Sequence, residues 1–288
     1  MRAEACWRQA LATADRALAS GALVPLATEL VEQPQLAPFQ LRRLLNRTPK
    51  HLRPGGPKPN PFLPWEPELE VCRPGPGHVL LLNKFPVQPG HVLLITDHWA
   101  PQSGWLDSND WAAVAEVARD TGGLWFFNSC AAAGASQPHR HLQLLPRAPG
   151  QASCPLADLY RGLLAAGPSD GAGCDERAFP WSFQLGRRLD PVGHGDLADL
   201  YGRQMRALGL GDPSRDSQPS QPYNVLFNDQ WFLSVRRCRE HAAGFSVNAL
   251  GFAGWLLQTE HSDLAWLERH GPWALLQAVA TPSLTAPS

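Results

Sequence analysis

The sequence lacks several features that mark specialised classes of protein. It has 288 residues and a formal net charge of -1, so no excess of positive charge is available to attract nucleic acid. No apolar run approaches the ~18 residues that a membrane-spanning helix needs, so we expect no membrane insertion. Residues 1–20 carry Glu4 and Asp15 and have no continuous apolar stretch, which argues against a secretory signal.

Cysteine is used without any paired spacing. The six cysteines stand at positions 6, 72, 130, 154, 174 and 238, and none of them forms a Cys-x-x-Cys motif. Scattered thiols in a chain of this length are typical of a reduced, cytoplasmic protein, and they exclude a zinc knuckle. Apolar residues make up 44% of the chain, which indicates a well-buried globular protein.

The stretch Asn128–Pro146 combines small residues with an alternating polar pattern. His139, His141 and Gln143 stand two apart, and because two is the period of a β-strand we expect their side chains on one face. Leu142 and Leu144 would point to the other face. The small and flexible residues before the strand leave room for a polyanion, with main-chain amides as donors. They include Gly134, Ala135, Ser136 and Gln137.

Imidazole suits phosphorus chemistry because it is uncharged and nucleophilic near neutrality, with an unperturbed pKa of about 6.5. One of these histidines could carry a nucleotidyl group covalently, while Gln143 donates its amide to a phosphate oxygen. Two other interpretations remain open. His139 and His141 could be half of a metal site, although no third ligand lies nearby in the sequence, or they could be ordinary structural histidines.

His139, His141 and Gln143, preceded by Gly134 and Ser136, resemble the signature of diadenosine tetraphosphate (Ap4A) phosphorylase, also called ATP adenylyltransferase. This family belongs to the transferase branch of the histidine-triad superfamily and is related to galactose-1-phosphate uridylyltransferase. The resemblance implies that His141 is the nucleophile, assisted by His139 and Gln143. A Gln at position 143, where the hydrolases have a third His, goes with transfer to phosphate or a sugar phosphate. The resemblance implies no resident metal.

The resemblance extends over roughly residues 58–280 and implies further substrate-binding residues. These are Asn83 and Lys84 after the first hairpin strand, Asn128, and Asn248 and Gly251 in the segment 244–254. His91, which closes the turn of the same hairpin, is expected to be structural or peripheral. Two lysines of the family are replaced in this chain. Thr48 stands at one position, with Arg47, Lys50 and Arg53 as candidate substitutes, and Gln258 or Thr259 stands at the other.

The order of expected elements indicates an α+β fold. Residues 78–96 and 223–237 predict hairpins, and Ser108 is expected to cap a helix that continues to about Thr121. A helix over residues 2–20 would bury Trp7, Leu11, Ala14 and Leu18, residues 24–64 are expected to be irregular, and 262–280 would form two helices broken at Gly271-Pro272. We expect a histidine-triad-like, mainly antiparallel sheet flanked by helices, with two related halves in one compact unit. The expected divisions are an arm over 1–57, a catalytic half over 58–210 and a C-terminal half over 211–288.

The resemblance implies phosphorolysis of Ap4A to ATP and ADP through a nucleotidyl-histidine. Its partners would be the dinucleoside polyphosphate, ATP, ADP and inorganic phosphate, with Mg²⁺ accompanying the polyphosphate, in a monomer or homodimer. Two alternatives remain: a hexose-1-phosphate uridylyltransferase of the same superfamily, or a nucleotide-binding sensor without turnover.

Overall fold

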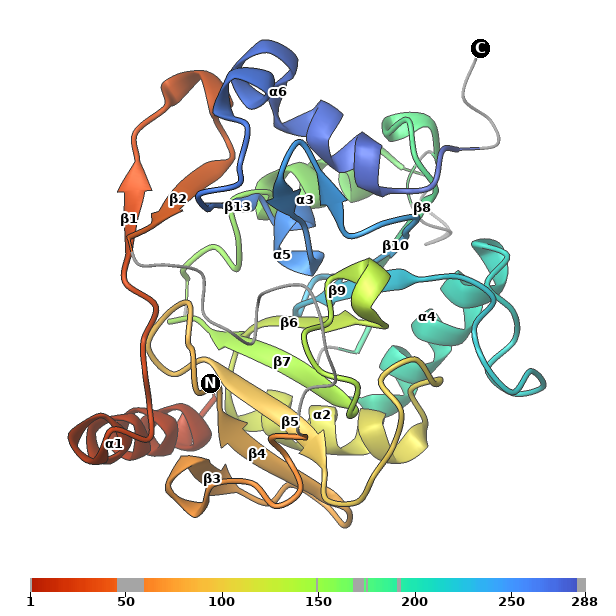
Figure 1. Cartoon of the computed structure of the whole chain (residues 1–288). Helices are drawn as coiled ribbons and strands as arrows, with labels where there is room; N and C mark the ends of the chain where they lie inside the picture. The colour runs from red at the N-terminus through yellow and green to blue at the C-terminus, as the bar shows by residue number, and fades with distance from the viewer. Residues whose placement is uncertain are drawn as a thin grey trace.

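The computed structural model describes residues 2–45, 60–148, 150–167, 174, 176–190 and 193–283. The fold is α+β, with a large antiparallel sheet between two groups of helices (Figure 1). The helices are α1 Ala5–Ser20, α2 Ser108–Asp120, α3 Ala157–Ala166, α4 His194–Ala207, α5 Ala249–Phe252 and α6 Leu264–Val279. The strands are β1 Thr28–Val31, β2 Gln40–Leu44, β3 Glu70–Cys72, β4 His78–Leu82, β5 Val92–Thr96, β6 Gly123–Asn128, β7 His141–Pro146, β8 Phe183–Arg187, β9 Tyr223–Phe227, β10 Trp231–Arg236, β11 His241–Ala242, β12 Phe245–Ser246 and β13 Trp255–Gln258.

The main sheet has the strand order β3-β4-β5-β7-β6-β9-β10-β8, and every neighbouring pair in it is antiparallel. Both predicted hairpins are present: β4 pairs with β5 from His78 opposite Thr96, and β9 pairs with β10. The sheet runs without interruption from the first hairpin to the second, because β6 pairs with β9. The predicted division at residue 211 remains a prediction.

Hydrophobic residues cover both faces of this sheet. One cluster joins α1, α2 and α4 to the face that carries Leu142 and Leu144, as the alternation of β7 predicted. A second cluster joins α3, α5 and α6 to the opposite face, where Leu145 and Phe126 point (Figure 1). The part of that opposite face formed by β4, β5 and β7 is where the functional site lies.

The predictions for the helices need two corrections. The N-cap of α2 is Asp107 rather than Ser108, because the Asp107 carboxylate accepts from two main-chain amides and completes a capping box. Helix α1 ends at Gly21 as predicted, but Leu18 on its expected inner face is 47% exposed. The residues that α1 buries are the smaller Ala10, Thr13, Ala14 and Ala17. The predicted break in the last helix is confirmed, since Gly271 has non-helical angles.

Residues 24–64 were expected to be irregular, and this was wrong for their first half. β1 and β2 lie there and form a separate three-stranded sheet with β13, which pairs parallel to β2. The candidate basic residues Arg47, Lys50 and Arg53, together with Thr48, lie outside the described residues. All six cysteines are free thiols. In the part of the chain that the structure describes, no helix has the length and apolar character needed to span a membrane.

Candidate active site

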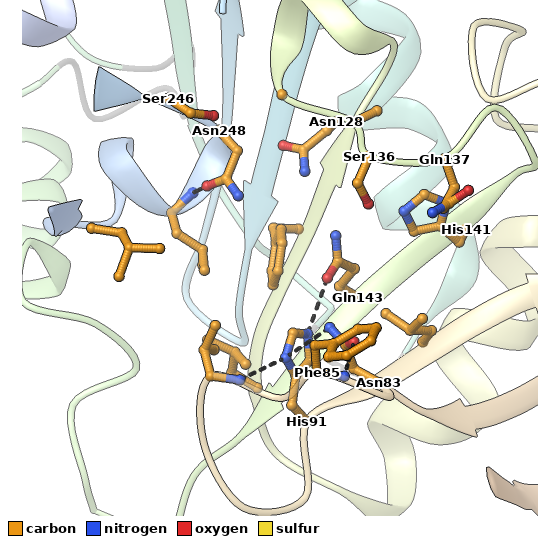
Figure 2. A pocket seen from close by; sticks show the side chains of 18 of the residues that line it. Asn83, Phe85, His91, Asn128, Ser136, Gln137, His141, Gln143, Ser246 and Asn248 are labelled. Atoms are coloured by element: carbon orange, nitrogen blue, oxygen red, sulfur yellow. Dashed lines mark hydrogen bonds between the residues drawn. The ribbon is translucent and has the colours of Figure 1, made fainter. Parts of the chain in front are cut away.

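A cavity of about 1960 Å³ opens between the β4-β5-β7 part of the sheet and the segment that contains β12, α5 and β13. Its lining includes all but one of the residues predicted from the sequence to act in the site (Figure 2). They are Asn83, Lys84, Asn128, Gly134, Ala135, Ser136, Gln137, His141, Gln143, Asn248 and Gly251. The exception is His139.

His141 is the first residue of β7, and its ring lies in the wall of the cavity. Its Nδ1 lies 2.8 Å from the main-chain oxygen of His139, so Nδ1 carries the proton and donates it. Nε2 then keeps its lone pair, and no group among the described residues bonds to it. Burial lowers the pKa of His141 to about 4. The ring is therefore neutral near pH 7 and can act as a nucleophile without a separate base.

His139 lies on the same side of the chain as His141, since Phe62 contacts both rings. It is completely buried and does not line the cavity. Its Nε2 bonds to the main-chain oxygen of Thr96 at 2.8 Å, and its Nδ1 bonds to the Asn60 side chain at 3.0 Å. With both ring nitrogens occupied, His139 reaches the site through its main-chain oxygen, which fixes the tautomer of His141.

Gln143 follows His141 on the cavity face of β7, and His91 sets the orientation of its amide. Nε2 of His91 lies 3.0 Å from Oε1 of Gln143, while Nδ1 faces the Asn83 amide nitrogen at 3.3 Å and the Val87 N–H at 3.5 Å. Burial lowers the pKa of His91 to about 4, so this ring is neutral and carries a single proton. Since both groups at Nδ1 are donors, that proton must sit on Nε2.

His91 therefore leaves the amino group of Gln143 for a ligand, and Figure 2 shows that group directed away from His91. From the sequence we expected His91 to be structural or peripheral. The structure places it in the lining of the cavity, where it holds both Gln143 and Asn83. Its position after the turn of the first hairpin was the only sequence signal for this contact.

The loop between β6 and β7 wraps closely around one end of the cavity. Gly134 has a φ of +88°, and a Cβ built on it would lie 2.5 Å from the Cβ of Asn248. Only glycine allows this approach between the loop and the start of α5. The amides of Gly134 and Ala135 bond to main-chain oxygens within the loop. Within the described residues 134–137, the N–H groups of Ser136 and Gln137 have no main-chain acceptor, so these two amides remain available as donors.

Asn128 ends β6 and has only one side of its amide free. Its Oδ1 accepts from the Asn224 side chain at 2.8 Å and from the Ala249 N–H at 2.9 Å. Its amino group faces the cavity as a donor. Asn224 is held in turn by Arg237, a fully buried guanidinium whose described partners are Asn224 and main-chain oxygens. Figure 2 thus shows Asn128, Ser136 and Gln143 around the same end of the cavity as His141.

The charged residues of the cavity are few. Lys84 lines it, and its ammonium group is paired with Glu66, with both side chains more than a third exposed. Arg42 and Arg147 are the other basic residues in the described lining, and in the described part of the chain neither guanidinium pairs with a carboxylate. Thr259, which with Gln258 is one of two candidates for the position of a family lysine, also lines the cavity. Contact of Lys84 with a phosphate remains a prediction.

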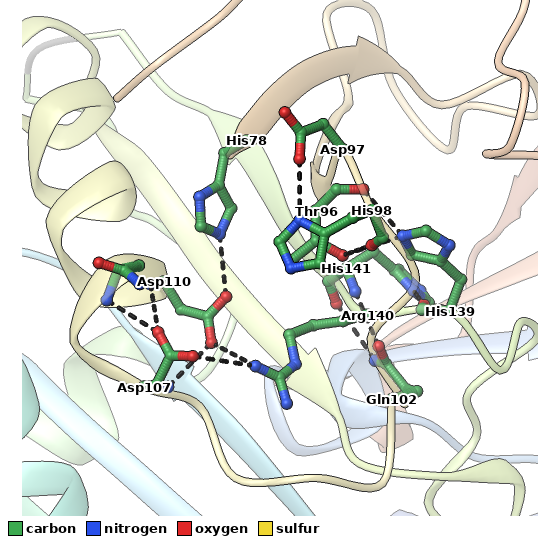
Figure 3. A network of polar contacts seen from close by, with 11 residues as sticks. His78, Thr96, Asp97, His98, Gln102, Asp107, Asp110, His139, Arg140 and His141 are labelled. Atoms are coloured by element: carbon green, nitrogen blue, oxygen red, sulfur yellow. Dashed lines mark hydrogen bonds and ion pairs between the residues drawn. The ribbon is translucent and has the colours of Figure 1, made fainter. Parts of the chain in front are cut away.

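A polar network on the helix side of the sheet anchors the start of β7. Arg140 points away from the cavity and bonds to Asp110 at 3.0 Å, and Asp110 also holds His78 at 2.9 Å (Figure 3). Asp110 lies in the first turn of α2, so this ion pair fixes β7 against that helix. In the described ranges, no group of three or more His, Cys, Asp or Glu residues has the arrangement of a metal site.

Comparison with known proteins identifies the family. Residues 1–161 match the Ap4A phosphorylase N-terminal domain, and residues 139–282 match the ATP adenylyltransferase C-terminal domain. Diadenosine 5',5'''-P1,P4-tetraphosphate phosphorylase 2 of Saccharomyces cerevisiae is 29% identical over 231 residues, which cover 71% of this chain and 70% of the relative.

Solved structures of a yeast protein have the same fold. The crystal structure of yeast Ap4A phosphorylase Apa2 superimposes with a TM-score of 0.74 at 20% identity, covering 100% of this chain and 98% of that one. Its complex with Ap4A gives a TM-score of 0.73 at 22% identity, covering 98% and 99%. These likenesses show the fold. The two domain matches, which span nearly the whole sequence, show that the chain belongs to the Ap4A phosphorylase family of ATP adenylyltransferases, which are nucleotidyltransferase enzymes.

Proposed function

We propose that the chain catalyses the phosphorolysis of Ap4A to ATP and ADP through a nucleotidyl group carried on His141. The observation that carries the proposal is the state of this imidazole. It is buried in the cavity wall, its Nδ1 proton is given to the His139 oxygen, and its Nε2 is free among the described residues. The relative Apa2 has been solved in complex with Ap4A and with AMP, which supports a nucleotide in the corresponding cavity.

In the first step, Nε2 of His141 attacks the phosphorus next to one adenosine. An N–P bond forms, the P–O bond to the second phosphate breaks, and ATP leaves. In the second step, an oxygen of inorganic phosphate attacks the same phosphorus. The N–P bond breaks, ADP leaves, and the imidazole returns to its neutral state. The His139 oxygen accepts the Nδ1 proton throughout, which stabilises the positive charge on the ring while phosphorus is attached.

The donors around His141 would bind the phosphate under attack. The amino groups of Gln143 and Asn128 are fixed by His91 and Asn224, and Ser136 adds a hydroxyl group. Because their orientation is set before the ligand arrives, these donors would stabilise developing charge without reorganisation.

The remaining phosphates need positive charge as well. Lys84, Arg42 and Arg147 line the cavity and are the candidates for this role among the described residues. The carboxylates in the lining are Glu66 and Glu240, too few to build a protein cage for Mg²⁺. A divalent cation would instead be held by substrate oxygens and water, and would neutralise part of the polyphosphate charge.

The test is incubation with Ap4A in the presence and absence of inorganic phosphate. With phosphate we expect ATP and ADP in equal amounts. Without phosphate we expect one ATP per enzyme and a mass increase of one AMP on His141. His141→Ala should give neither, while the control His270→Ala, in α6, should behave as the wild type. Full turnover by His141→Ala would refute the proposal.

The same assay separates the alternatives. UDP-glucose with galactose-1-phosphate would give uridine products if the chain were a hexose-1-phosphate uridylyltransferase. Binding of Ap4A without any product would instead indicate a sensor.

A further inference from the structure

The two strands that carry His141 and Asn128 separate at the active site. β6 and β7 are paired from Gly123 opposite Pro146 to Phe126 opposite Gln143, and the ladder ends there. Asn128 continues in register with Asn224 of β9. The separation makes room for the loop around the cavity, but it also removes the pairing between β6 and β7 at His141 and Asn128, which stay paired only on their other edges, with Ile95 and Asn224.

The side chain of Gln102 fills this gap. Its Oε1 accepts the His141 N–H at 2.7 Å, and its Nε2 donates to the oxygen of His141 at 3.1 Å and to the oxygen of Asn128 at 2.7 Å. Figure 3 shows the amide lying against the main chain of His141. The carboxamide of Gln102 therefore makes the hydrogen bonds that a peptide group of a neighbouring strand would make, with its oxygen as the acceptor and its amino group as the donor.

The main chain of Gln102 is fixed as firmly as its side chain. The N–H of Gln102 bonds to the oxygen of Pro138 at 2.8 Å, and the N–H of Arg140 bonds to the oxygen of Ala100 at 2.9 Å. Pro101 forms an isolated bridge with His139 between them. Gln102 is only 2% exposed. The segment 100–102 therefore runs beside 138–140, and this pairing fixes the position of the Gln102 side-chain amide.

We propose that Gln102 is a positioning residue for the nucleotidyl transfer, one that holds the main chains of His141 and Asn128 at a fixed separation. The direction of Nε2 depends on the His141 main chain, because the ring is held to the neighbouring oxygen of His139. A shift of about 1 Å at such a position can lower a rate by about 100-fold. The activity readouts rest on the proposed function.

The chemistry of the gap restricts which residues can replace Gln102. The His141 N–H needs an acceptor, and the two oxygens need a donor. Methionine has a similar length and offers neither. A glutamate carboxylate accepts from the N–H, but its negative charge would be repelled by the two main-chain oxygens. A protonated glutamic acid offers an acceptor and a donor together. Burial and the facing oxygens would raise the pKa of a glutamate at this place.

The experiment compares Gln102→Met and Gln102→Glu with the matched control Gln204→Met. Gln204 is also a buried glutamine whose amide bonds to a strand oxygen, that of Phe232 at 3.0 Å, and it does not line the cavity. The measurements are the single-turnover release of ATP without phosphate, the affinity for AMP by calorimetry, and the midpoint of thermal unfolding, with rates taken well below each midpoint.

We expect Gln102→Met to lower the single-turnover rate by about 100-fold, with a much smaller change in the affinity for AMP. Gln204→Met should keep the wild-type rate even where it lowers the unfolding midpoint. Gln102→Glu should be slow at neutral pH and recover in part as the pH falls, because the protonated acid restores the acceptor and one of the two hydrogen bonds that the amide donates. Because protonation of this buried glutamate would also restore stability, the unfolding midpoint is measured at each pH, and a rate that recovers well below every midpoint reports positioning.

An unchanged rate in Gln102→Met would overturn the inference, as would a rate in Gln102→Glu that shows no recovery at acidic pH. Equal losses in Gln102→Met and Gln204→Met would overturn it too, since both would then reflect stability alone. If the wild type releases no ATP, the proposed function fails instead. The inference is then tested by ¹⁵N NMR of His141, whose Nδ1-protonated tautomer should be lost in Gln102→Met and kept in Gln204→Met.

Discussion

Lowering the pH from 7.5 to 5.5 should leave the first half-reaction almost unchanged, because burial lowers the pKa of His141 to about 4. With that pKa, about 97% of the rings are neutral at pH 5.5. An imidazole with the ordinary pKa of about 6.5 would be about 9% neutral at the same pH. Because only the neutral ring can attack phosphorus, the two cases differ by about tenfold in rate.

The assay is a single turnover with enzyme in excess of Ap4A and without inorganic phosphate, followed by release of ATP between pH 8 and 4.5. The phosphates of the substrate do not titrate in this range, since all four of them are esterified or bridging and have no second ionisation. Omitting inorganic phosphate removes the acceptor, which does titrate near neutrality. The fluorescence of the eleven tryptophans shows at each pH whether the chain is still folded.

A flat profile down to pH 5.5, followed by a fall at lower pH, is the expected result. A rate that drops about tenfold between pH 7.5 and 5.5, with a midpoint near 6.5, would mean that His141 ionises like an exposed histidine. The assignment of a buried, neutral nucleophile held by a main-chain acceptor would then be wrong.

Three further predictions concern stability and affinity. The pKa values of His91 and His141 are lowered to about 4 in the folded chain, so between pH 6.5 and 4 the unfolded chain binds more protons than the folded chain. The free energy of unfolding should therefore decrease as the pH is lowered, by about 2 kcal/mol per histidine at pH 5. Urea titrations at pH 7 and 5 measure this, and a chain at least as stable at pH 5 would contradict it. Arg140→Met removes the guanidinium from the buried Asp110 carboxylate, which keeps His78 and the Asp107 N–H as partners, and should cost about 3 kcal/mol in the same titration. Arg161→Met, in an exposed pair, should change little. Gly134→Ala should weaken AMP binding by about tenfold in calorimetry, because the new Cβ would lie 2.5 Å from the Cβ of Asn248 and the loop would have to move, at a cost of about 1.4 kcal/mol. An unchanged affinity would show that the loop can move at no cost.

The sequence alone predicted correctly those elements whose structure is determined by the local pattern of residues. Alternation from His141 to Leu144 placed His141 and Gln143 toward the cavity and Leu142 and Leu144 toward the helices α1, α2 and α4. The two hairpins and the break at Gly271 also follow from local signals. The resemblance supplied the candidate substrate-binding residues, and the cavity brings them together although Asn83 and Asn248 are far apart in the chain.

The parts that could not be predicted depend on contacts between distant residues. β2 is a strand because β13 pairs with it, and nothing within its own five residues distinguishes it from an irregular segment. His139 has the same spacing as His141 and Gln143, but Phe62 and Trp99 pack on its ring and keep it out of the cavity. Gln102 carries no sequence signal, since a lone glutamine in a loop has no spacing to reveal its role.

These non-local contacts explain how the nucleophile can be both buried and reactive. An imidazole inside a protein loses hydration, and the low pKa of His141 is the result. Ring orientation must then come from the protein, and three elements provide it: the His139 oxygen holds Nδ1, the Gln102 amide holds the main chain, and Arg140 ties the same strand to α2. These contacts hold the ring of His141, its main chain and the residue before it, so the start of β7 cannot rotate or slide without breaking a buried hydrogen bond. A nucleophile fixed in this way reaches phosphorus in one orientation, which is the condition under which a single neutral ring can transfer a nucleotidyl group without a separate base.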